Sequence, residues 1–401
     1  MTIRLAFTLI DKNQWAGGYQ YQINLLRIWQ EYGDRRILPV LFVGRDDTET
    51  DIKPFRSLID DRIVASTIFN RKRKGRRLMD AFLSGRDRGA EKIFKQNRID
   101  VIFGPAVYYG RSFGIPAVAW IPDFQHRQFP EMFNGFAYWK RELGFRAQIA
   151  GGMTIMVSSE TAKQDLEKYY PSARGAIFVV PFAVMIPREN LPEDPQETRR
   201  RYHLPSNYFY LPNQFWKHKN HETVIEALRI LADHRNDVVV AASGQPHDPR
   251  HPGLYHQLRT AVREYHLENN FVFLGVIPYT DVLGLMRTSV AVINPSLMEG
   301  WSTTVEEAKS LGVPLILSDI PVHREQASTI ADFFAAQSPG SLAQVLDNCM
   351  VNMIRSDNHR GRDTTDDVNR RVQLYVQRFA DVIFAACRSH ESPLPGSAHE
   401  K

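Results

Sequence analysis

The sequence is poor in cysteine and contains no long apolar run. Its 401 residues include only Cys349 and Cys387, and both fall within helical patterns. A disulfide framework is therefore disfavoured, and a reducing compartment such as the cytoplasm is expected. No apolar stretch approaches the roughly 20 residues of a membrane-spanning helix. The first residues are too few and too polar for a signal peptide, so we expect a cytoplasmic protein.

Several signatures of bound groups are also missing. There is no Cys/His spacing that would hold zinc, no Asp-x-Asp pair at the end of an expected strand, and no G-x-G-x-x-G turn. The last absence disfavours a nicotinamide or flavin dinucleotide. Neither an internal repeat nor a low-complexity block is present. We therefore expect no metal and no tightly bound cofactor.

The composition that remains is typical of a globular protein, with 43% hydrophobic and 24% charged residues. A chain of this length exceeds a usual single domain, so two domains are expected. The net charge is only +5, but residues 70–77 form a concentrated basic run. It could contact nucleic acid or anionic lipid headgroups, or form a solvated loop. Aromatic residues do not interleave with it, which argues against nucleic acid.

Strand and helix patterns alternate along the chain, which favours parallel sheets in an α/β fold. In the first half, strands are expected at residues 4–9, 38–43, 63–68, 101–103, 117–121, 155–158 and 178–180, with helices at 19–32 and 76–96. In the second half, strands are expected at residues 208–211, 238–242, 271–274, 290–296 and 313–317, with helices at 222–233, 253–266, 279–288 and 366–387. Residues 319–326 are expected to form a loop. The proline-rich residues 181–205 suggest the connection between domains.

The most informative stretch follows the strand at residues 290–296. Its loop contains Gly300, and a helix is expected to begin near Thr303, where Thr303 and Glu306 form a capping-box pattern. Free N–H groups and the helix dipole at such a position suit a phosphate group. The sequence therefore predicts an anion site on the backbone amides of residues 301–304.

Two carboxylates bracket this predicted anion site. Glu299 precedes the turn, and Glu307 lies in the first turns of the helix. Carboxylates accept hydrogen bonds from hydroxyl groups, so the pair indicates a sugar and a ribose on either side of a diphosphate. The alternative is that Glu306 and Glu307 only favour the helix dipole.

A second candidate loop follows the strand at residues 208–211. It contains Lys217 and Lys219 and leads into a helix expected at residues 222–233. Two lysines before a helix N-terminus are well placed to hold a diphosphate. A solvated basic loop is the alternative.

The segment from Glu299 to Ala308, EGWSTTVEEA, resembles the E-x7-E segment of retaining glycosyltransferases of the GT-B fold, family 4. In that family, the first Glu lies near the donor sugar and the second binds the ribose of the nucleotide. The resemblance assigns these roles to Glu299 and Glu307. Relatives often hold an Arg and a Lys on the donor diphosphate. Lys219 matches the Lys, whereas Gln214 stands in the Arg position, where Lys217 would compensate.

The resemblance also implies site residues in the first half of the chain. Gly17 and Gly18 match paired glycines that line the cleft between the domains, although a simple tight turn is equally compatible with them. An Asp-x-x-His element places His126, and less firmly Asp123, near the donor sugar or the reacting centre. The alternative is that Asp123 caps a helix and His126 is exposed.

The expected site thus has a catalytic set and a donor-binding set. The catalytic residues would be Glu299, His126 and Asp123. The diphosphate and nucleotide would be bound by Lys219, Gln214, Lys217, Gly300, Trp301, Ser302, Thr303, Thr304, Glu307, Gly244, Gly17 and Gly18.

The fold implied by the resemblance is GT-B, an α/β fold with two Rossmann-like doubly wound parallel-sheet domains facing across a cleft. We expect an acceptor-side domain at residues 1–186, a linker at 187–204, and a nucleotide-sugar-binding domain at 205–365. A helix at 366–388 would cross back to the first domain, and 389–401 would be a disordered tail.

The implied activity is metal-independent transfer of a hexose, with mannose as a candidate, from a nucleoside-diphosphate sugar with retention of configuration. The acceptor would be a glycan or a lipid-linked glycan in bacterial surface polysaccharide synthesis. The basic run would then contact the anionic inner face of the cytoplasmic membrane. A nucleotide-sugar epimerase or phosphorylase of the same fold, and a non-catalytic nucleotide- or carbohydrate-binding module, remain alternatives. The sequence does not specify the base, the sugar, the linkage or the oligomeric state.

Overall fold

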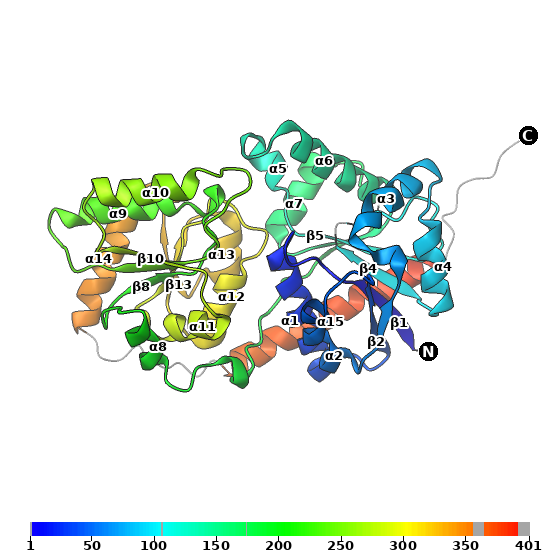
Figure 1. The fold of residues 1–401 in the computed structure, drawn as a ribbon, viewed down its shortest axis with the longest axis horizontal. Helices are drawn as coiled ribbons and strands as arrows, with labels where there is room; N and C mark the ends of the chain where they lie inside the picture. Colours follow the sequence, from blue (N-terminus) through cyan, green and yellow to red (C-terminus); the bar gives the residue numbers. More distant parts are fainter. Residues whose placement is uncertain (1, 106, 174, 356–364, 392–401) are drawn as a thin grey trace, which may run out of the picture. The chain divides into compact units, whose positions relative to one another are not determined.

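The structure is a computed structural model (Figure 1). It describes residues 2–105, 107–173, 175–355 and 365–391. Within these ranges, no helix combines the length and the hydropathy that crossing a bilayer requires. The tail expected from residue 389 lies outside the described residues from residue 392 onward.

Two compact units divide the chain. Among the described residues, the first unit comprises those of 1–128, 135–182 and 371–401, and the second comprises those of 129–134 and 183–370. Residues 187–204, which we expected to be a linker, lie inside the second unit. There, helix α8 (Pro195–Arg201) packs against helix α11 (Tyr279–Thr288). Pro195 occupies the first position of α8, where a missing N–H costs nothing.

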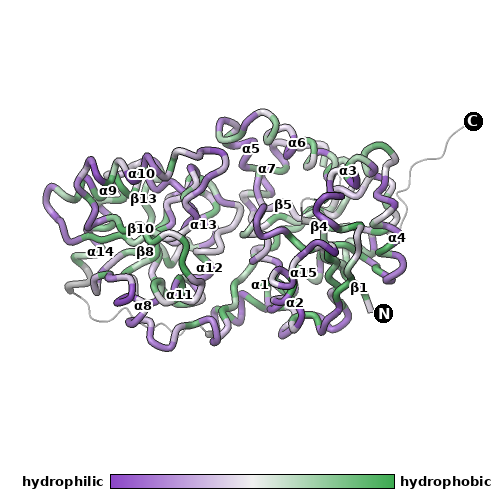
Figure 2. The backbone as a smooth tube through the Cα atoms, in the orientation of Figure 1, coloured by the Kyte–Doolittle hydropathy of each residue, from purple (hydrophilic) through white to green (hydrophobic). Residues whose placement is uncertain are grey.

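The first unit is built on a seven-stranded parallel sheet with the strand order β3-β2-β1-β4-β5-β6-β7. Its strands are β1 (Ile3–Thr8), β2 (Ile37–Val43), β3 (Ile63–Ala65), β4 (Val101–Pro105), β5 (Ala117–Ile121), β6 (Thr154–Val157) and β7 (Ile177–Val179). Helices cover both faces, so the central strands are apolar on successive residues. Figure 2 shows this as hydrophobic strands inside more hydrophilic outer helices.

The helices of the first unit include one break that the sequence pattern did not reveal. They are α1 (Ala16–Tyr32), α2 (Glu49–Arg56), α3 (Lys74–Leu83), α4 (Arg88–Gln96), α5 (Gln125–Gln128), α6 (Gly135–Ala150) and α7 (Glu160–Tyr169). The single helix expected at residues 76–96 is wrong, because α3 and α4 are separate. Gly85 has a φ of +73°, which ends the first helix. Asp87 caps the second by accepting from the Ala90 amide.

Helix α15 (Thr365–Glu391) belongs to the first unit from residue 371 onward. Phe379 packs against Trp29 of α1 and Phe103 of β4, with ring centroids 5.4 Å apart in both pairs. Tyr375 is also almost completely buried. The C-terminal helix therefore completes the core of the N-terminal unit.

The second unit is built on a six-stranded parallel sheet with the order β10-β9-β8-β11-β12-β13. Its strands are β8 (Phe209–Leu211), β9 (Val240–Ser243), β10 (Phe271–Gly275), β11 (Val292–Asn294), β12 (Leu315–Ser318) and β13 (Ala331–Phe334). Besides α8 and α11, its helices are α9 (His221–Ala232), α10 (Leu254–Glu264), α12 (Thr303–Leu311), α13 (Pro321–Ala327) and α14 (Pro339–Arg355). Apolar cores lie on both faces of this sheet.

Both sheets have a point where the strand order reverses, between β1 and β4 in the first unit and between β8 and β11 in the second. Parallel α/β sheets bind ligands at such points, outside the carboxyl ends of the strands. In the second unit, the loops after β8 and β11 are those that carry the predicted diphosphate site.

The sequence predicted a loop at residues 319–326, and this prediction is wrong. Most of this segment is helix α13, which has Pro321 at its start. Proline favours the first helical turn because its φ angle is preset for a helix. The helix matters for the site because it brings His323 and Gln326 towards the ends of β11 and β12.

Candidate functional site

Side chains fix the backbone at the N-terminus of α12 by hydrogen bonds. Ser302 is the N-cap, and its Oγ accepts a hydrogen bond from the Val305 amide. The Ser302 amide donates to Gln326 Oε1 at 3.2 Å, and Gln326 Nε2 donates back to the Ser302 carbonyl at 2.9 Å. The described residues provide no acceptor for the amides of Thr303 and Thr304. These two N–H groups are therefore available for an anion.

The predicted capping box of Thr303 and Glu306 is wrong. Ser302 caps the helix instead, and Glu306 lies one residue beyond the position that a capping box would need. Its carboxylate is 1% exposed and accepts hydrogen bonds from Lys309 at 2.9 Å and Gln326 at 3.0 Å. Glu306 thus fixes α12 against α13, and it is not a ligand-facing group.

Lys219 and Glu299 meet at the point where the strand order reverses. Lys219 follows β8 and Glu299 follows β11, and these neighbouring parallel strands end at the same edge of the sheet. Lys219 Nζ donates to Glu299 Oε1 at 2.5 Å, and Ser296 Oγ donates to the same oxygen at 2.8 Å. Burial acts to raise the pKa of Glu299, but the charge of Lys219, with smaller contributions from His323 and His218, lowers it to about 2. Glu299 is therefore an anion at neutral pH.

Glu307 has the opposite electrostatic environment. It is 9% exposed and forms no ion pair with any described residue, and burial raises its pKa to about 7. Tyr279, the first residue of α11, donates from its hydroxyl to Glu307 Oε1 at 2.7 Å, which opposes that rise. The Tyr279 ring is 44% exposed. Glu307 can thus offer hydrogen-bonding oxygens at a half-open position.

Asparagines that the sequence reasoning missed connect the strand ends to α12. Asn294 ends β11 and donates to Ser302 Oγ at 2.8 Å. Asn213 follows β8 and donates to Asn294 Oδ1 at 3.1 Å, while its own oxygen accepts from Thr304 Oγ1 at 3.4 Å. Asn213 follows the strand expected at residues 208–211 and Asn294 lies near the end of the strand expected at 290–296, so their positions were a usable signal. Gln326 and Tyr279 carried no such signal, because their partners are distant in the sequence.

The rest of the predicted donor-binding set has mixed placements. Gly300 and Trp301 are half-buried in the turn between Glu299 and the cap of α12. Gln214 Oε1 accepts from the Gln245 amide at 2.7 Å, so its side chain holds the loop after β9. Lys217 Nζ bonds Glu222 at 2.6 Å on the surface. Lys219, and not Lys217, is therefore the lysine beside Glu299.

Gly244 follows β9 with a φ of +154°. A Cβ at this position would lie 2.4 Å from the Asn213 carbonyl oxygen. The absence of a side chain at Gly244 thus lets the loop after β8 pass directly beneath it. Its role in this structure is to position Asn213 and Gln214.

The predicted site residues of the first half lie in the first unit. Gly17 and Gly18 are in the first turn of α1, which begins at Ala16 and not at residue 19 as expected. A Cβ on Gly18 would lie 2.4 Å from ring atoms of Trp15, which packs over this turn. Asp123 accepts from the Gln125 amide at 3.0 Å and from Arg141 at 2.6 Å. These contacts match the alternative in which Asp123 caps a helix.

His126 is completely buried, so the expected alternative of an exposed histidine is wrong. Its Nε2 lies 3.1 Å from Glu142, which also binds Arg127 and accepts from the Tyr170 hydroxyl at 2.6 Å. Burial and the nearby Arg141 lower the pKa of His126 although Glu142 raises it. This cluster would have to open before His126 could contact a sugar. Its catalytic role stays a prediction.

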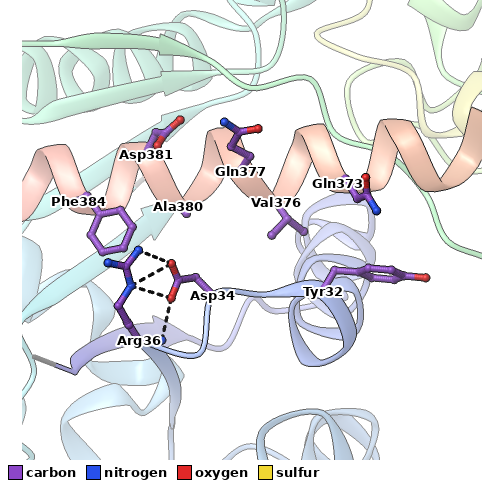
Figure 3. Close-up of a pocket in the computed structure, with 9 residues that line it drawn as sticks. All are labelled: Tyr32, Asp34, Arg36, Gln373, Val376, Gln377, Ala380, Asp381 and Phe384. Atoms are coloured by element: carbon purple, nitrogen blue, oxygen red, sulfur yellow. Dashed lines mark hydrogen bonds and ion pairs between the residues drawn. The ribbon is translucent and has the colours of Figure 1, made fainter.

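A surface pocket of about 450 Å³ lies in the first unit (Figure 3). It is formed by α15 and the turn between α1 and β2, where Arg36 pairs with Asp34 and lies over the Phe384 ring. This turn precedes β2 and therefore lies at the amino edge of the sheet, opposite to the edge where such folds bind ligands.

In the described residues, no group of three or more His, Cys, Asp or Glu side chains is arranged to hold a metal ion.

Residues 196–352 match the family described as glycosyl transferases group 1. The match covers less than half of the chain and lies within the second unit. The matched residues contain the whole cluster described above, from Asn213 to Gln326, including Lys219 and Glu299. The match therefore falls on the unit whose geometry shows available amides and a paired carboxylate.

Other proteins resemble the chain more distantly. The O-antigen chain mannosyltransferase RfbU of Salmonella typhimurium is 27% identical over 119 residues, which are 30% of this chain and 31% of that protein. The alignment thus spans about a third of that relative. Anabaena HepE in complex with UDP and glucose has a TM-score of 0.65 at 14% identity, covering 96% of this chain and 99% of HepE.

A glycosyltransferase from Rickettsia africae has a TM-score of 0.61 at 16% identity, covering 97% of this chain and 96% of that one. These likenesses extend over both units and concern the fold. Together with the two parallel sheets, they show that the chain has the GT-B fold.

Proposed function

We propose that this protein is a retaining glycosyltransferase of family 4, which transfers a hexose from a nucleoside-diphosphate sugar to a glycan or a lipid-linked glycan. The observation that carries the proposal is the N-terminus of α12. Its Thr303 and Thr304 amides have no acceptor among the described residues, and Lys219 and Glu299 meet at the same sheet edge. The domain match supports the same reading.

Each group has a role in this proposal. The α12 amides and Lys219 hold the diphosphate and stabilise the charge that develops on it as the sugar leaves. Glu299, which stays ionised, accepts hydrogen bonds from sugar hydroxyls and orients the ring. Glu307, together with the Tyr279 hydroxyl, binds the ribose. The acceptor hydroxyl attacks on the face from which the diphosphate departs, so configuration is retained.

The donor can be identified by thermal unfolding with a panel of nucleotide sugars. A ligand that binds the native state raises the melting temperature by mass action. We expect one of the UDP, GDP, ADP or dTDP sugars to raise it, and mannose donors deserve the first trial because of the likeness to RfbU. Lys219→Met and Glu299→Gln should remove the shift, whereas Lys217→Met should keep most of it. Equal loss in the Lys217 variant would contradict the assignment of Lys219.

Transfer itself needs a second assay. Free nucleoside diphosphate should be released in quantity only when an acceptor sugar is supplied, and the product linkage should keep the donor's anomeric configuration. Conversion of the donor without an acceptor would favour an epimerase, and phosphate-dependent release would favour a phosphorylase. Binding without turnover for every acceptor would favour a non-catalytic module.

We also propose that the first unit touches an anionic membrane surface, where lipid-linked acceptors reside on the cytoplasmic side. The basic run is only partly available, because Arg71 binds Asp47 and Asp51 and Arg77 binds Asp87. What remains exposed on and before α3 are basic side chains followed by apolar ones. They are Lys72, Arg73, Lys74, Arg76, Leu78, Met79, Phe82 and Leu83. A basic helix with exposed apolar residues suits an anionic lipid interface.

Vesicle sedimentation tests this contact. Replacing Lys72, Arg73, Lys74 and Arg76 with serine should weaken binding to vesicles containing phosphatidylglycerol, while leaving thermal stability nearly unchanged. The matched control replaces the same number of exposed basic residues elsewhere, namely Lys53, Arg259, Arg263 and Arg287. Equal loss in both variants would mean that only net charge matters, and no loss in either would reject the membrane contact.

A further inference from the structure

His323, on α13, is completely buried beside the proposed diphosphate site. Its Nδ1 lies 3.0 Å from the Ser318 carbonyl oxygen and 3.1 Å from Ser318 Oγ. Ser318 Oγ lies 2.5 Å from the carbonyl oxygen of Ser296, to which it donates its single hydrogen. Both groups near Nδ1 are therefore acceptors, so Nδ1 must carry the proton. In the neutral ring, Nε2 is then an unprotonated acceptor.

No described residue donates a hydrogen bond to His323 Nε2, although this atom is buried. An unpaired polar atom in such a place is costly and calls for an explanation. Ser296, which accepts from Ser318, also donates from its hydroxyl to Glu299 at 2.8 Å. Ser318 and Ser296 thus link the histidine to Glu299. Ser318 donates to the Ser296 carbonyl oxygen, and the Ser296 hydroxyl donates to the carboxylate that Lys219 neutralises.

The charges around His323 set its protonation state. Burial lowers its pKa most, Glu299 raises it, and Lys219 lowers it. On its own helix, Arg324 and Glu325 are exposed, and Arg324 is paired with Asp319. On α12, the neighbouring helix, Glu306 is already paired with Lys309, and both contact Gln326 of α13. The ring is therefore neutral while Lys219 remains on Glu299.

This balance changes when Lys219 binds an anion, as the proposed function requires. A diphosphate on Lys219 would compete with Glu299 for the same ammonium group. Glu299 would then be a buried carboxylate without its counter-charge, which is strongly unfavourable unless another cation replaces it. We propose that His323 takes up a proton at Nε2 when an anionic ligand draws Lys219 away from Glu299.

His323 is thus a positioning residue that keeps Glu299 ionised and oriented in the loaded site. The bound state holds one proton more than the free state, so affinity for a nucleoside diphosphate should rise as the pH falls. This inference rests on the proposed function only through the anion on Lys219. It adds a coupling between donor binding and protonation.

Calorimetry with UDP and GDP tests the coupling in buffers of different ionisation enthalpy. For whichever nucleotide binds, we expect uptake of up to about one proton per nucleotide, since one site changes its charge. The variant His323→Asn keeps a donor for the Ser318 carbonyl but cannot take up a proton. It should bind with a proton uptake near zero and with weaker pH dependence. Unchanged uptake in this variant would overturn the proposal.

A ligand-free measurement separates this inference from the proposed function. Titration of the His323 ring by NMR, assigned with His323→Asn, reports its pKa directly. Lys219→Met should raise that pKa, because Glu299 loses its cation. Glu299→Gln should lower it, because the attracting anion is gone. If no nucleotide binds, the proposed function fails while these opposite shifts still decide the inference. Absence of the rise in Lys219→Met would mean that Glu299 itself is protonated, and would refute it.

Discussion

At the residue scale, the two site carboxylates are distinguished by their neighbours. Glu299 is beside Lys219 and is an anion with a pKa of about 2, whereas burial holds the pKa of Glu307 near 7. A ligand that presents hydroxyl groups to both would meet a fixed anion on one side and a titrating acid on the other. Of these two carboxylates, only Glu307 can therefore change its charge in the ordinary working range of pH.

Replacing Glu307 with Gln should stabilise the free protein at alkaline pH. The pKa of Glu307 is raised from an ordinary value of 4.5 to about 7, so the folded state binds more protons than the unfolded state between these values. Stability due to this group falls as pH rises through that window. Gln keeps an acceptor for Tyr279 without ionising. We expect a gain of up to about 3 kcal/mol at pH 8 that shrinks towards pH 5.

Denaturant unfolding of both proteins at several pH values provides the measurement. Glu306→Gln is the control, since it removes the charge from a paired carboxylate and should destabilise the protein. A difference between Glu307→Gln and the parent that does not vary with pH would contradict the raised pKa. Because Glu307 is proposed to bind the ribose, the same variant should also weaken nucleotide binding.

Site residues could be predicted from the sequence where the local pattern itself places them. Glu299 and Glu307 are in one short segment, so their positions follow from a single strand, turn and helix. Tyr279 and Gln326 could not be predicted, because their bonds to this segment depend on how α11 and α13 pack against α12. The pairing of Lys219 with Glu299 required the neighbouring positions of β8 and β11.

At the scale of the element, α12 depends on its cap. The sequence favoured Thr303 as that cap, because a glutamate follows it at the right spacing, yet Ser302 has the extended backbone of a cap residue. The choice was decided by Asn294 and Gln326, which hold Ser302 from outside the helix. Local helix signals therefore located the N-terminus to within one residue.

Ser302→Ala should destabilise the second unit by about 1–2 kcal/mol, because it removes the cap and the partner of Asn294. Thr303→Ala is the matched control and should change stability by no more than a few tenths of a kcal/mol, in the stabilising direction, because alanine is the better helix former. Thermal unfolding would detect the former as a loss of roughly 2–8 °C. A larger effect at Thr303 than at Ser302 would restore the capping assignment made from the sequence.

Two glycines at strand ends should respond differently to alanine. Gly244 combines a φ of +154° with a Cβ position 2.4 Å from the Asn213 carbonyl, whereas Gly275 has a φ of +67° and open space around it. Gly275→Ala should cost about 1 kcal/mol from backbone strain alone. Gly244→Ala should cost more and also weaken nucleotide binding, because it displaces the loop that leads to Lys219. Similar losses of stability and binding in the two variants would contradict this role.

At the scale of the whole molecule, the two units are not two successive halves of the chain, because the residues from 371 onward belong to the first unit. The α/β class and the succession of strands β1 to β12 could be predicted, because hydrophobic patterns are local, whereas β13 was not expected. The unit boundary could not, since proline content suggested a connection at residues 181–205, nearly all of which belongs to the second unit. The break between α3 and α4 was also missed, because their apolar spacing continues across Gly85.

Phe379→Ala should destabilise the first unit selectively. Phe379 is 1% exposed and packs against Trp29 and Phe103, so its removal leaves a cavity that costs about 3–5 kcal/mol. Calorimetry should show one unfolding transition moving down. The transition that a bound nucleotide stabilises, which we assign to the second unit, should stay in place. Loss of nucleotide binding at low temperature would show that the units do not behave independently.

Completion of the N-terminal core by α15 has a consequence for synthesis. During translation, strands β1 to β7 leave the ribosome long before Tyr375 and Phe379 exist, so the nascent first unit must wait with part of its interior uncovered. The second unit, by contrast, can close as soon as α14 has emerged. A stop codon late in the message would therefore remove core side chains from the first unit, which is the unit synthesised first.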